Sequence, residues 1–176
     1  MALITVRTIK ASDRQELLAV LARCGRHSGY FADADGELVP HAEASLFDER
    51  FSTAWVAEVS GRVVGHIAVM PLLLNEDVES IPLWTAATGQ TTDQHTLIKR
   101  LFVDPAAQGT GIAQALMAQA MEQIDSTGQI GVLDTISIAQ AAMRLYQRLG
   151  WREVARTKPY WTDEPFDLVL FVAPGH

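Results

Sequence analysis

Apolar and polar residues alternate in several short runs along the chain, and this two-residue period predicts β-strands. Two of the runs are divided by Ser60-Gly61, a dipeptide typical of a hairpin turn. The run at residues 130–136 is apolar enough for a strand that is buried on both faces. The predicted strands cover residues 4–9, 55–59, 62–70, 97–103, 130–136, 154–156 and 168–172.

Other segments repeat their apolar residues at helical spacing. Ser12 and Gln15 have the spacing of a capping box, which predicts a helix from there to about Cys24, with Gly25 as its stop. Further helices are expected at residues 43–51, from 110 or 111 to 128, and at 139–149, whereas residues 72–94 are expected to be irregular. This order of elements predicts an α/β fold, with an α+β mixed sheet flanked by helices.

The length of 176 residues is typical of one domain, which we expect to cover residues 1–176. Apolar residues make up 48% of the chain and charged residues 20%, the usual balance of a globular protein. No apolar stretch approaches the ~20 residues that a bilayer-spanning helix needs, and the first ten residues lack the pattern of a signal peptide. Cys24 is the sole cysteine, so no intramolecular disulfide can form. We therefore expect a cytoplasmic protein with no membrane partner.

Acidic residues are concentrated in the middle of the chain. The formal net charge is −7, but residues 28–96 alone hold eleven acidic and two basic residues, a net charge of −9. Such a balance disfavours binding to nucleic acid, and it favours a cationic ligand where the acids line a pocket. The alternative is a solvated acidic surface that serves solubility.

A predicted strand, a turn of small residues and an amphipathic helix follow one another at residues 101–113. Glycines in such a turn let backbone N–H groups point at a ligand, and a helix N-terminus carries a partial positive charge. A phosphate or pyrophosphate is therefore the expected guest. The residues after Gly111 are Ile112 and Ala113 instead of Lys-Ser or Lys-Thr, which disfavours a P-loop. Two glycines deep in the chain also fit the dinucleotide fingerprint poorly.

The same segment resembles a known family. Gln108-x-x-Gly111-x-Ala113 is similar to the Gln/Arg-x-x-Gly-x-Gly/Ala loop that binds acyl-coenzyme A in the GCN5-related N-acetyltransferases (GNAT). The string from Ala142 through Leu145-Tyr146 to Gly150-Trp151 resembles the second signature of that family. The resemblance covers residues 97–151 and implies a GNAT-type acyl-CoA N-acyltransferase fold, a twisted mixed sheet splayed between its fourth and fifth strands.

The resemblance also implies an activity, the transfer of an acetyl group from acetyl-CoA to a primary amine by direct attack. Tyr146 would protonate the leaving thiolate, although a half-buried packing role is the alternative for this ring. The Val103 N–H would stabilise the oxyanion. The implied coenzyme-binding residues are Leu101, Phe102 and Val103 along the pantetheine arm, and Gln108, Gly109, Thr110, Gly111, Ile112 and Ala113 around the pyrophosphate.

Two positions depart from the family pattern. Leu97 stands where family members often carry the carboxylate that serves as base, and Ala139 replaces an Asn that touches the coenzyme. His95, two residues before Leu97, is our candidate base because an imidazole titrates near neutral pH. A solvent-exposed loop histidine is the alternative, and Asp93 is a further candidate base.

No histidine or cysteine spacing favours a metal site. The expected partner is an amine acceptor, a small and cationic molecule or a peptide, bound by loops at residues 25–51 and 72–94, and a homodimer is left open. Two rival functions remain. One is a non-catalytic coenzyme-A-binding or sensing module on the same fold, and the other is an interaction protein with a vestigial pocket.

Overall fold

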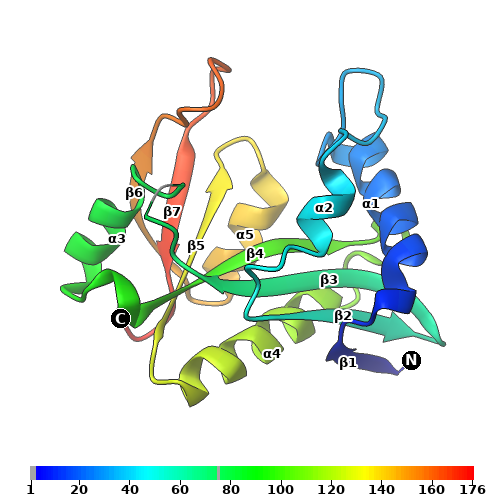
Figure 1. The fold of residues 1–176 in the computed structure, drawn as a ribbon, viewed down its shortest axis with the longest axis horizontal. Helices are drawn as coiled ribbons and strands as arrows, with labels where there is room; N and C mark the ends of the chain where they lie inside the picture. Colours follow the sequence, from blue (N-terminus) through cyan, green and yellow to red (C-terminus); the bar gives the residue numbers. More distant parts are fainter. Residues whose placement is uncertain (1–2, 75) are drawn as a thin grey trace. The chain divides into compact units, whose positions relative to one another are not determined.

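A computed structural model describes residues 3–74 and 76–176 of the chain. The chain divides into two compact units, each built from two segments. The first unit comprises Met1–Met70 and Lys99–Glu122, and the second comprises Pro71–Ile98 and Gln123–His176. Figure 1 follows the chain through both of them by colour. The prediction of a single domain stays a prediction.

The strands of the first unit begin with an antiparallel meander. It consists of β1 (Ile4–Thr8), β2 (Thr53–Val59) and β3 (Arg62–Pro71). Ser60 and Gly61 both have positive φ, 51° and 75°, as the predicted hairpin turn requires. One extra residue, Val64, lies opposite the step between Ala57 and Glu58, so β3 carries a bulge there.

Helices cover both faces of these strands. Figure 1 shows α1 (Arg14–Ser28) and α2 (Ala42–Leu46) on one face and α4 (Ile112–Ser126) on the other. The core under α1 and α2 consists of Leu17, Val20, Leu21, Cys24, Ala42, Leu46, Val56, Val63 and Phe102. On the opposite face α4 approaches β3 closely, since a Cβ on Gly65 would lie 3.1 Å from Leu116 Cδ1.

Helix α1 differs from its prediction at both ends. It begins after Asp13 instead of Ser12, because the Asp13 carboxylate accepts the Lys10 N–H at 2.7 Å. It also continues past Gly25 to Gly29, which has a φ of 76°. Gly25 is a buried interior residue, and a Cβ there would lie 2.9 Å from the Ala32 Cβ. The glycine therefore permits close packing and does not end the helix. Helix α2 is likewise shorter than the predicted segment 43–51.

The second unit contains β5 (Ile130–Ile136), β6 (Arg152–Thr157) and β7 (Leu168–Val172). Strand β7 lies antiparallel to both β5 and β6. The first residues of β4 (His95–Val103) pair in parallel with β5, in a ladder of three residue pairs that ends at Leu97 and Val132. The strand order is β1-β2-β3-β4-β5-β7-β6, which confirms the mixed sheet.

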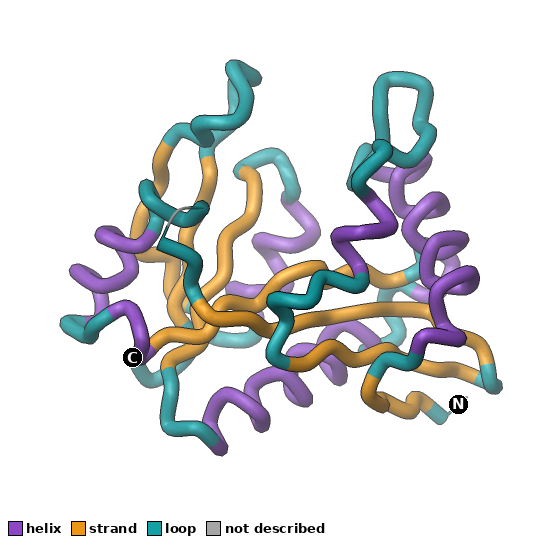
Figure 2. Tube along the Cα trace, in the orientation of Figure 1, coloured by secondary structure: helices purple, strands orange, loops and turns teal. Residues whose placement is uncertain are grey.

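Residues 72–94 are not irregular throughout, as the sequence had suggested. They include α3 (Ile81–Thr88), which packs against β6 and β7, and a short 3₁₀ turn at Thr92–Gln94. Pro82 lies in the first turn of α3, where a proline is compatible with a helix. Trp84 is 0% exposed, so its ring packs in the core of this unit. The remaining helix is α5 (Gln140–Arg148), and Figure 2 shows these helices against the strands and connecting loops.

The Gly25→Ala variant tests the packing role of that glycine. Alanine by itself would raise the stability of a helix by ~0.5–1 kcal/mol, but overpacking against Ala32 costs ~1–3 kcal/mol. We expect a lower free energy of unfolding, measured by urea denaturation. Ala19→Gly, at an exposed position of the same helix, calibrates the propensity contribution. If the Gly25→Ala protein were more stable than the wild type, the contact with Ala32 would not be what requires a glycine at this position.

Candidate functional site

The loop between β4 and α4 is fixed by Asp104. Its backbone N–H donates to the Val64 carbonyl at 2.7 Å, at the bulge of β3. Its Oδ1 accepts the Ala106 N–H at 3.1 Å, which caps the short 3₁₀ turn Pro105–Ala107. Its Oδ2 accepts two hydrogen bonds from Arg23 of α1, at 2.9 and 2.6 Å. The carboxylate therefore joins α1, β3 and the loop within the first unit.

The charge of this anchor follows from its surroundings. Burial alone would raise the pKa of Asp104, but the hydrogen bonds from Arg23 and from the Ala106 N–H outweigh it and hold the pKa below its usual range. Burial, and to a smaller extent the charge of Asp104, raise the pKa of the neighbouring Cys24 thiol to about 11 against the opposing charge of Arg23. The Cys24 Sγ lies 3.4 Å from the Val103 carbonyl oxygen. Cys24 is thus a buried thiol, not a nucleophile.

The predicted phosphate loop has the open backbone that its role requires. Gly109 and Gly111 have φ of 78° and 89°, and a Cβ on either would meet no atom within 4 Å. Thr110 Oγ1 donates to the Ala107 carbonyl at 2.7 Å, and Gln108 Nε2 donates to the Val103 carbonyl at 3.3 Å. The carbonyl of Gly111 accepts the first hydrogen bond of α4, from the Ala115 N–H. The N–H groups of residues 112–114 therefore have no partner within the helix. Their direction and the helix dipole suit an anion.

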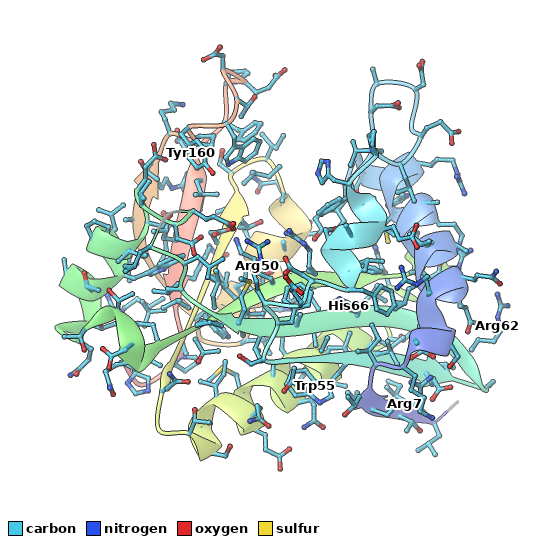
Figure 3. All side chains as sticks on the ribbon, viewed as in Figure 1. Arg7, Arg50, Trp55, Arg62, His66 and Tyr160 are labelled. Atoms are coloured by element: carbon cyan, nitrogen blue, oxygen red, sulfur yellow. The ribbon has the colours of Figure 1, made fainter. Side chains whose placement is uncertain are left out.

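No local pattern in the sequence indicates a break in β4 just before the predicted coenzyme-binding segment. Arg100 has a φ of 58°, in the left-handed region that side chains other than glycine rarely adopt. His66 on β3, labelled in Figure 3, lies 2.8 Å from the Arg100 carbonyl through its Nδ1. Burial lowers the pKa of His66 to about 4, so the ring is neutral and its Nδ1–H donates to that carbonyl. His66 stacks on Phe102, with ring centroids 5.4 Å apart.

The two predicted catalytic residues both lie in the second unit. Tyr146 on α5 is 7% exposed, and its ring packs at 5.5 Å from Phe171 and 6.4 Å from Trp151, measured between centroids. The ring thus has the packing contacts that the alternative interpretation predicted, and the catalytic role of its hydroxyl stays a prediction.

His95 is buried, not solvent-exposed. Its side chain is 1% exposed, with Nε2 2.9 Å from Thr88 Oγ1 and Nδ1 2.8 Å from the Thr91 carbonyl. A carbonyl only accepts, so Nδ1 carries a proton. The Thr88 hydroxyl that lies against Nε2 also donates to the Trp84 carbonyl at 3.0 Å. The role of His95 as a base stays a prediction, as does that of the exposed Asp93.

Residues 50–153 match the model of the acetyltransferase (GNAT) domain. The chain belongs to the GNAT family. The match confirms the resemblance on which the sequence argument rests, together with the expected enzyme class, an acyltransferase.

Individual relatives agree with this assignment. The uncharacterized N-acetyltransferase YjgM of Escherichia coli is 33% identical over 153 residues, which cover 85% of this chain and 82% of YjgM. The N-acetylaspartate synthetase of Danio rerio is 29% identical over 135 residues, which cover 73% of this chain but only 41% of that protein. The chain thus spans less than half of the zebrafish relative.

A solved GNAT structure shows the same fold. The GNAT acetyltransferase from Brucella melitensis, solved in complex with acetyl-CoA, has a TM-score of 0.60 to this chain at 21% identity. The superposition covers 96% of this chain and 88% of that protein. Together with the family match, this similarity confirms the predicted GNAT-type fold.

Residues 3–74 and 76–176 are the part of the chain that the structure describes. Within those residues, no helix is both long and apolar enough to cross a bilayer. The same part of the GNAT chain holds no group of three or more His, Cys, Asp or Glu side chains placed to bind a metal ion.

The anchor of the loop is tested by Asp104→Asn. Loss of the charge-assisted bonds to Arg23 lowers the free energy of unfolding at neutral pH by ~1–3 kcal/mol. Because the folded-state pKa of Asp104 is lowered, its contribution is present above the ordinary carboxyl pKa and lost as the pH falls through the folded value. The difference between the two proteins therefore shrinks in acid. Asp125→Asn, at an exposed position of α4, should change neither the free energy of unfolding nor its dependence on pH. An equal loss of stability in Asp125→Asn would contradict the role of Asp104 as the anchor of the loop.

Proposed function

We propose that this GNAT chain transfers the acetyl group of acetyl-CoA to a primary amine. The observation that carries the proposal is the junction before α4, where Gly109 and Gly111 hold an exposed left-handed backbone beside the unpaired N–H groups of a helix N-terminus. A pyrophosphate fits there because neither glycine has a neighbouring atom within 4 Å of where a Cβ would lie. Leu101, Phe102 and Val103 would hold the pantetheine arm through their backbone.

Acetyl-CoA, when bound, supplies the thioester carbonyl that the amine attacks. The acceptor first loses a proton, because an ammonium ion has no lone pair. The Val103 N–H would donate to the oxygen on which negative charge develops. The Tyr146 hydroxyl would give its proton to the departing sulfur, so that the products are the N-acetyl amine and free coenzyme A. No covalent enzyme intermediate is needed.

The proton of the acceptor amine has two candidate routes in this chain. Leu97, at the usual carboxylate position, is 0% exposed and takes no proton. His95 would act through the hydroxyl of Thr88, which bonds its Nε2. A water chain that ends at a solvent-exposed group such as Asp93 is the alternative route. A coenzyme-A-binding module without turnover remains the rival function, and the absence of a carboxylate at Leu97 is what favours it.

The proposed acceptor is a primary amine. One relative is named for the synthesis of N-acetylaspartate and the other for no acceptor. The acidic segment predicts a cationic acceptor, but ion pairs neutralise several of its carboxylates, including Glu43 with Arg14, Asp48 with Arg50 and Glu58 with Arg7. Its pull on a cation is therefore weaker than its formal charge suggests. A cytoplasmic location and a homodimer stay predictions.

The phosphate loop is tested by Gly111→Asp. A carboxylate at this position repels the pyrophosphate, so we expect coenzyme A binding to be lost in calorimetric titration while the protein stays folded. Gly128→Asp is the matched control, because Gly128 also has a left-handed φ, 70°, and no atom within 4 Å of an added Cβ, but follows the other end of α4. Retained micromolar binding by Gly111→Asp would refute the assignment.

The general acid is tested by Tyr146→Phe. Turnover should fall by ~10- to 1000-fold, in the range of general acid catalysis, while the affinity for coenzyme A stays the same because the ring and its contacts to Phe171 and Trp151 remain. Tyr160→Phe, which removes a hydroxyl from a residue that is 65% exposed, should have no effect. Unchanged turnover in Tyr146→Phe would make Tyr146 a packing residue.

A further inference from the structure

A cavity of about 510 Å³ lies within the first unit, outside the phosphate loop. It is formed by the start of α1, the helix α2 with the segment after it, and one residue of β4. Three arginines line it, Arg14, Arg50 and Arg100, against two acids, Asp48 and Glu49. Figure 3 labels Arg50 of this set. The balance of its lining is therefore positive, although the chain as a whole is acidic.

Two of these arginines are already neutralised. Arg14 Nη1 lies 2.6 Å from Glu43, and its guanidinium covers the ring of Phe47 at 4.3 Å. Arg50 forms a two-pronged ion pair with Asp48, at 2.8 and 2.5 Å. These cations have little charge left with which to attract a ligand.

Arg100 differs from both. Among the residues that the structure describes, no carboxylate forms an ion pair with it, and its buried Nε has no hydrogen-bond partner. Its guanidinium lies over the ring of Phe31, 4.9 Å from the centroid, a contact that leaves the N–H edge available. A buried guanidinium nitrogen without a partner is costly unless a ligand supplies the acceptor.

The backbone of Arg100 is held in place at a cost. A left-handed φ of 58° in a non-glycine residue stores backbone strain, which persists where surrounding contacts impose it. Here the neutral ring of His66 donates to the Arg100 carbonyl at 2.8 Å. Such strain is concentrated at ligand-binding positions. The hydrogen bond and the contact with Phe31 together fix the side chain against the cavity.

We propose that Arg100 binds a carboxylate of the acceptor, so that the enzyme acetylates amines that also carry a carboxylate, as amino acids do. The inference rests on the proposed acetyltransferase function and names the substrate class of its acceptor site. A guanidinium matches a carboxylate with two parallel hydrogen bonds. Glu49, exposed on the same cavity, has the charge that attracts the ammonium end of such a molecule.

The coenzyme also carries anions, so the test must separate its phosphates from an acceptor carboxylate. Acetyl transfer is measured for a panel of amino acids, each paired with its carboxamide, which keeps the amine and removes the negative charge. For the wild-type protein we expect kcat/KM to fall by ~10- to 100-fold from acid to amide, the worth of a charge-assisted hydrogen bond.

The variants are Arg100→Gln and Arg100→Lys, with Arg62→Gln as control. Arg62 lies at the exposed start of β3 in the same unit and does not line the cavity. Arg100→Gln should bring acid and amide within about threefold of each other by raising KM for the acid, Arg100→Lys should keep part of the preference, and Arg62→Gln should keep all of it. The KM for acetyl-CoA should stay constant in all three. Thermal unfolding verifies that each variant is folded.

Several results would overturn the inference. Equal use of acids and amides by the wild-type protein would do so and leave the acetyltransferase function standing. A raised KM for acetyl-CoA in Arg100→Gln, with the acid preference intact, would assign the residue to a coenzyme phosphate instead. Coenzyme A binding without transfer to any amine would refute the proposed function and the inference with it. If both variants unfold, calorimetric titration of the wild-type protein with the acids and with the amides decides the same question, because it compares the two affinities directly.

Discussion

The carboxylate of Asp104 is the constraint on which the candidate site depends. It is 7% exposed, and a carboxylate so placed costs free energy unless it is paired and hydrogen-bonded. Arg23 of α1 pairs with the carboxylate, the Ala106 N–H of the loop donates to it, and the Val64 carbonyl at the bulge of β3 accepts the Asp104 N–H. Three parts of the first unit therefore meet at one residue. The loop that follows starts from a fixed point, which a backbone site for phosphate requires.

Glycine serves two different purposes around this loop. At Gly109 and Gly111 the surroundings are open, and the residue is needed for a left-handed φ and for exposed N–H groups. At Gly65 the opposite holds, because a Cβ would lie 3.0 Å from the Phe102 carbonyl and 3.1 Å from Leu116. The absence of a side chain at Gly65 lets α4 lie against the strands, close to Ile112 at the first position of the helix.

The face of the strands under α1 and α2 carries the second polar arrangement of the first unit. His66 is 0% exposed and neutral, so its single N–H is available for the Arg100 carbonyl. That bond maintains a backbone conformation that a regular strand would not adopt, and this conformation sets the direction in which the Arg100 side chain leaves the strand. Among the described residues, Arg100 is the lining arginine of the cavity that forms no ion pair with a carboxylate. The formal charge of the segment could not show this, because it counts paired and unpaired groups alike.

The sequence by itself determined the strands, the phosphate loop and the family, because each has a local signature. The alternation at residues 130–136, the Ser60-Gly61 turn and the Gln108-x-x-Gly111-x-Ala113 string all lie within a few neighbouring residues. The tertiary structure alone decided features that depend on residues far apart in the chain. Gly25 looked like a helix stop until Ala32 was found against it, and His95 looked exposed until Thr88 and Thr91 were found on its ring. The left-handed Arg100 and its bond to His66, 34 residues away, have no local signature. Backbone strain and burial are set by packing partners, and a local pattern does not name those partners.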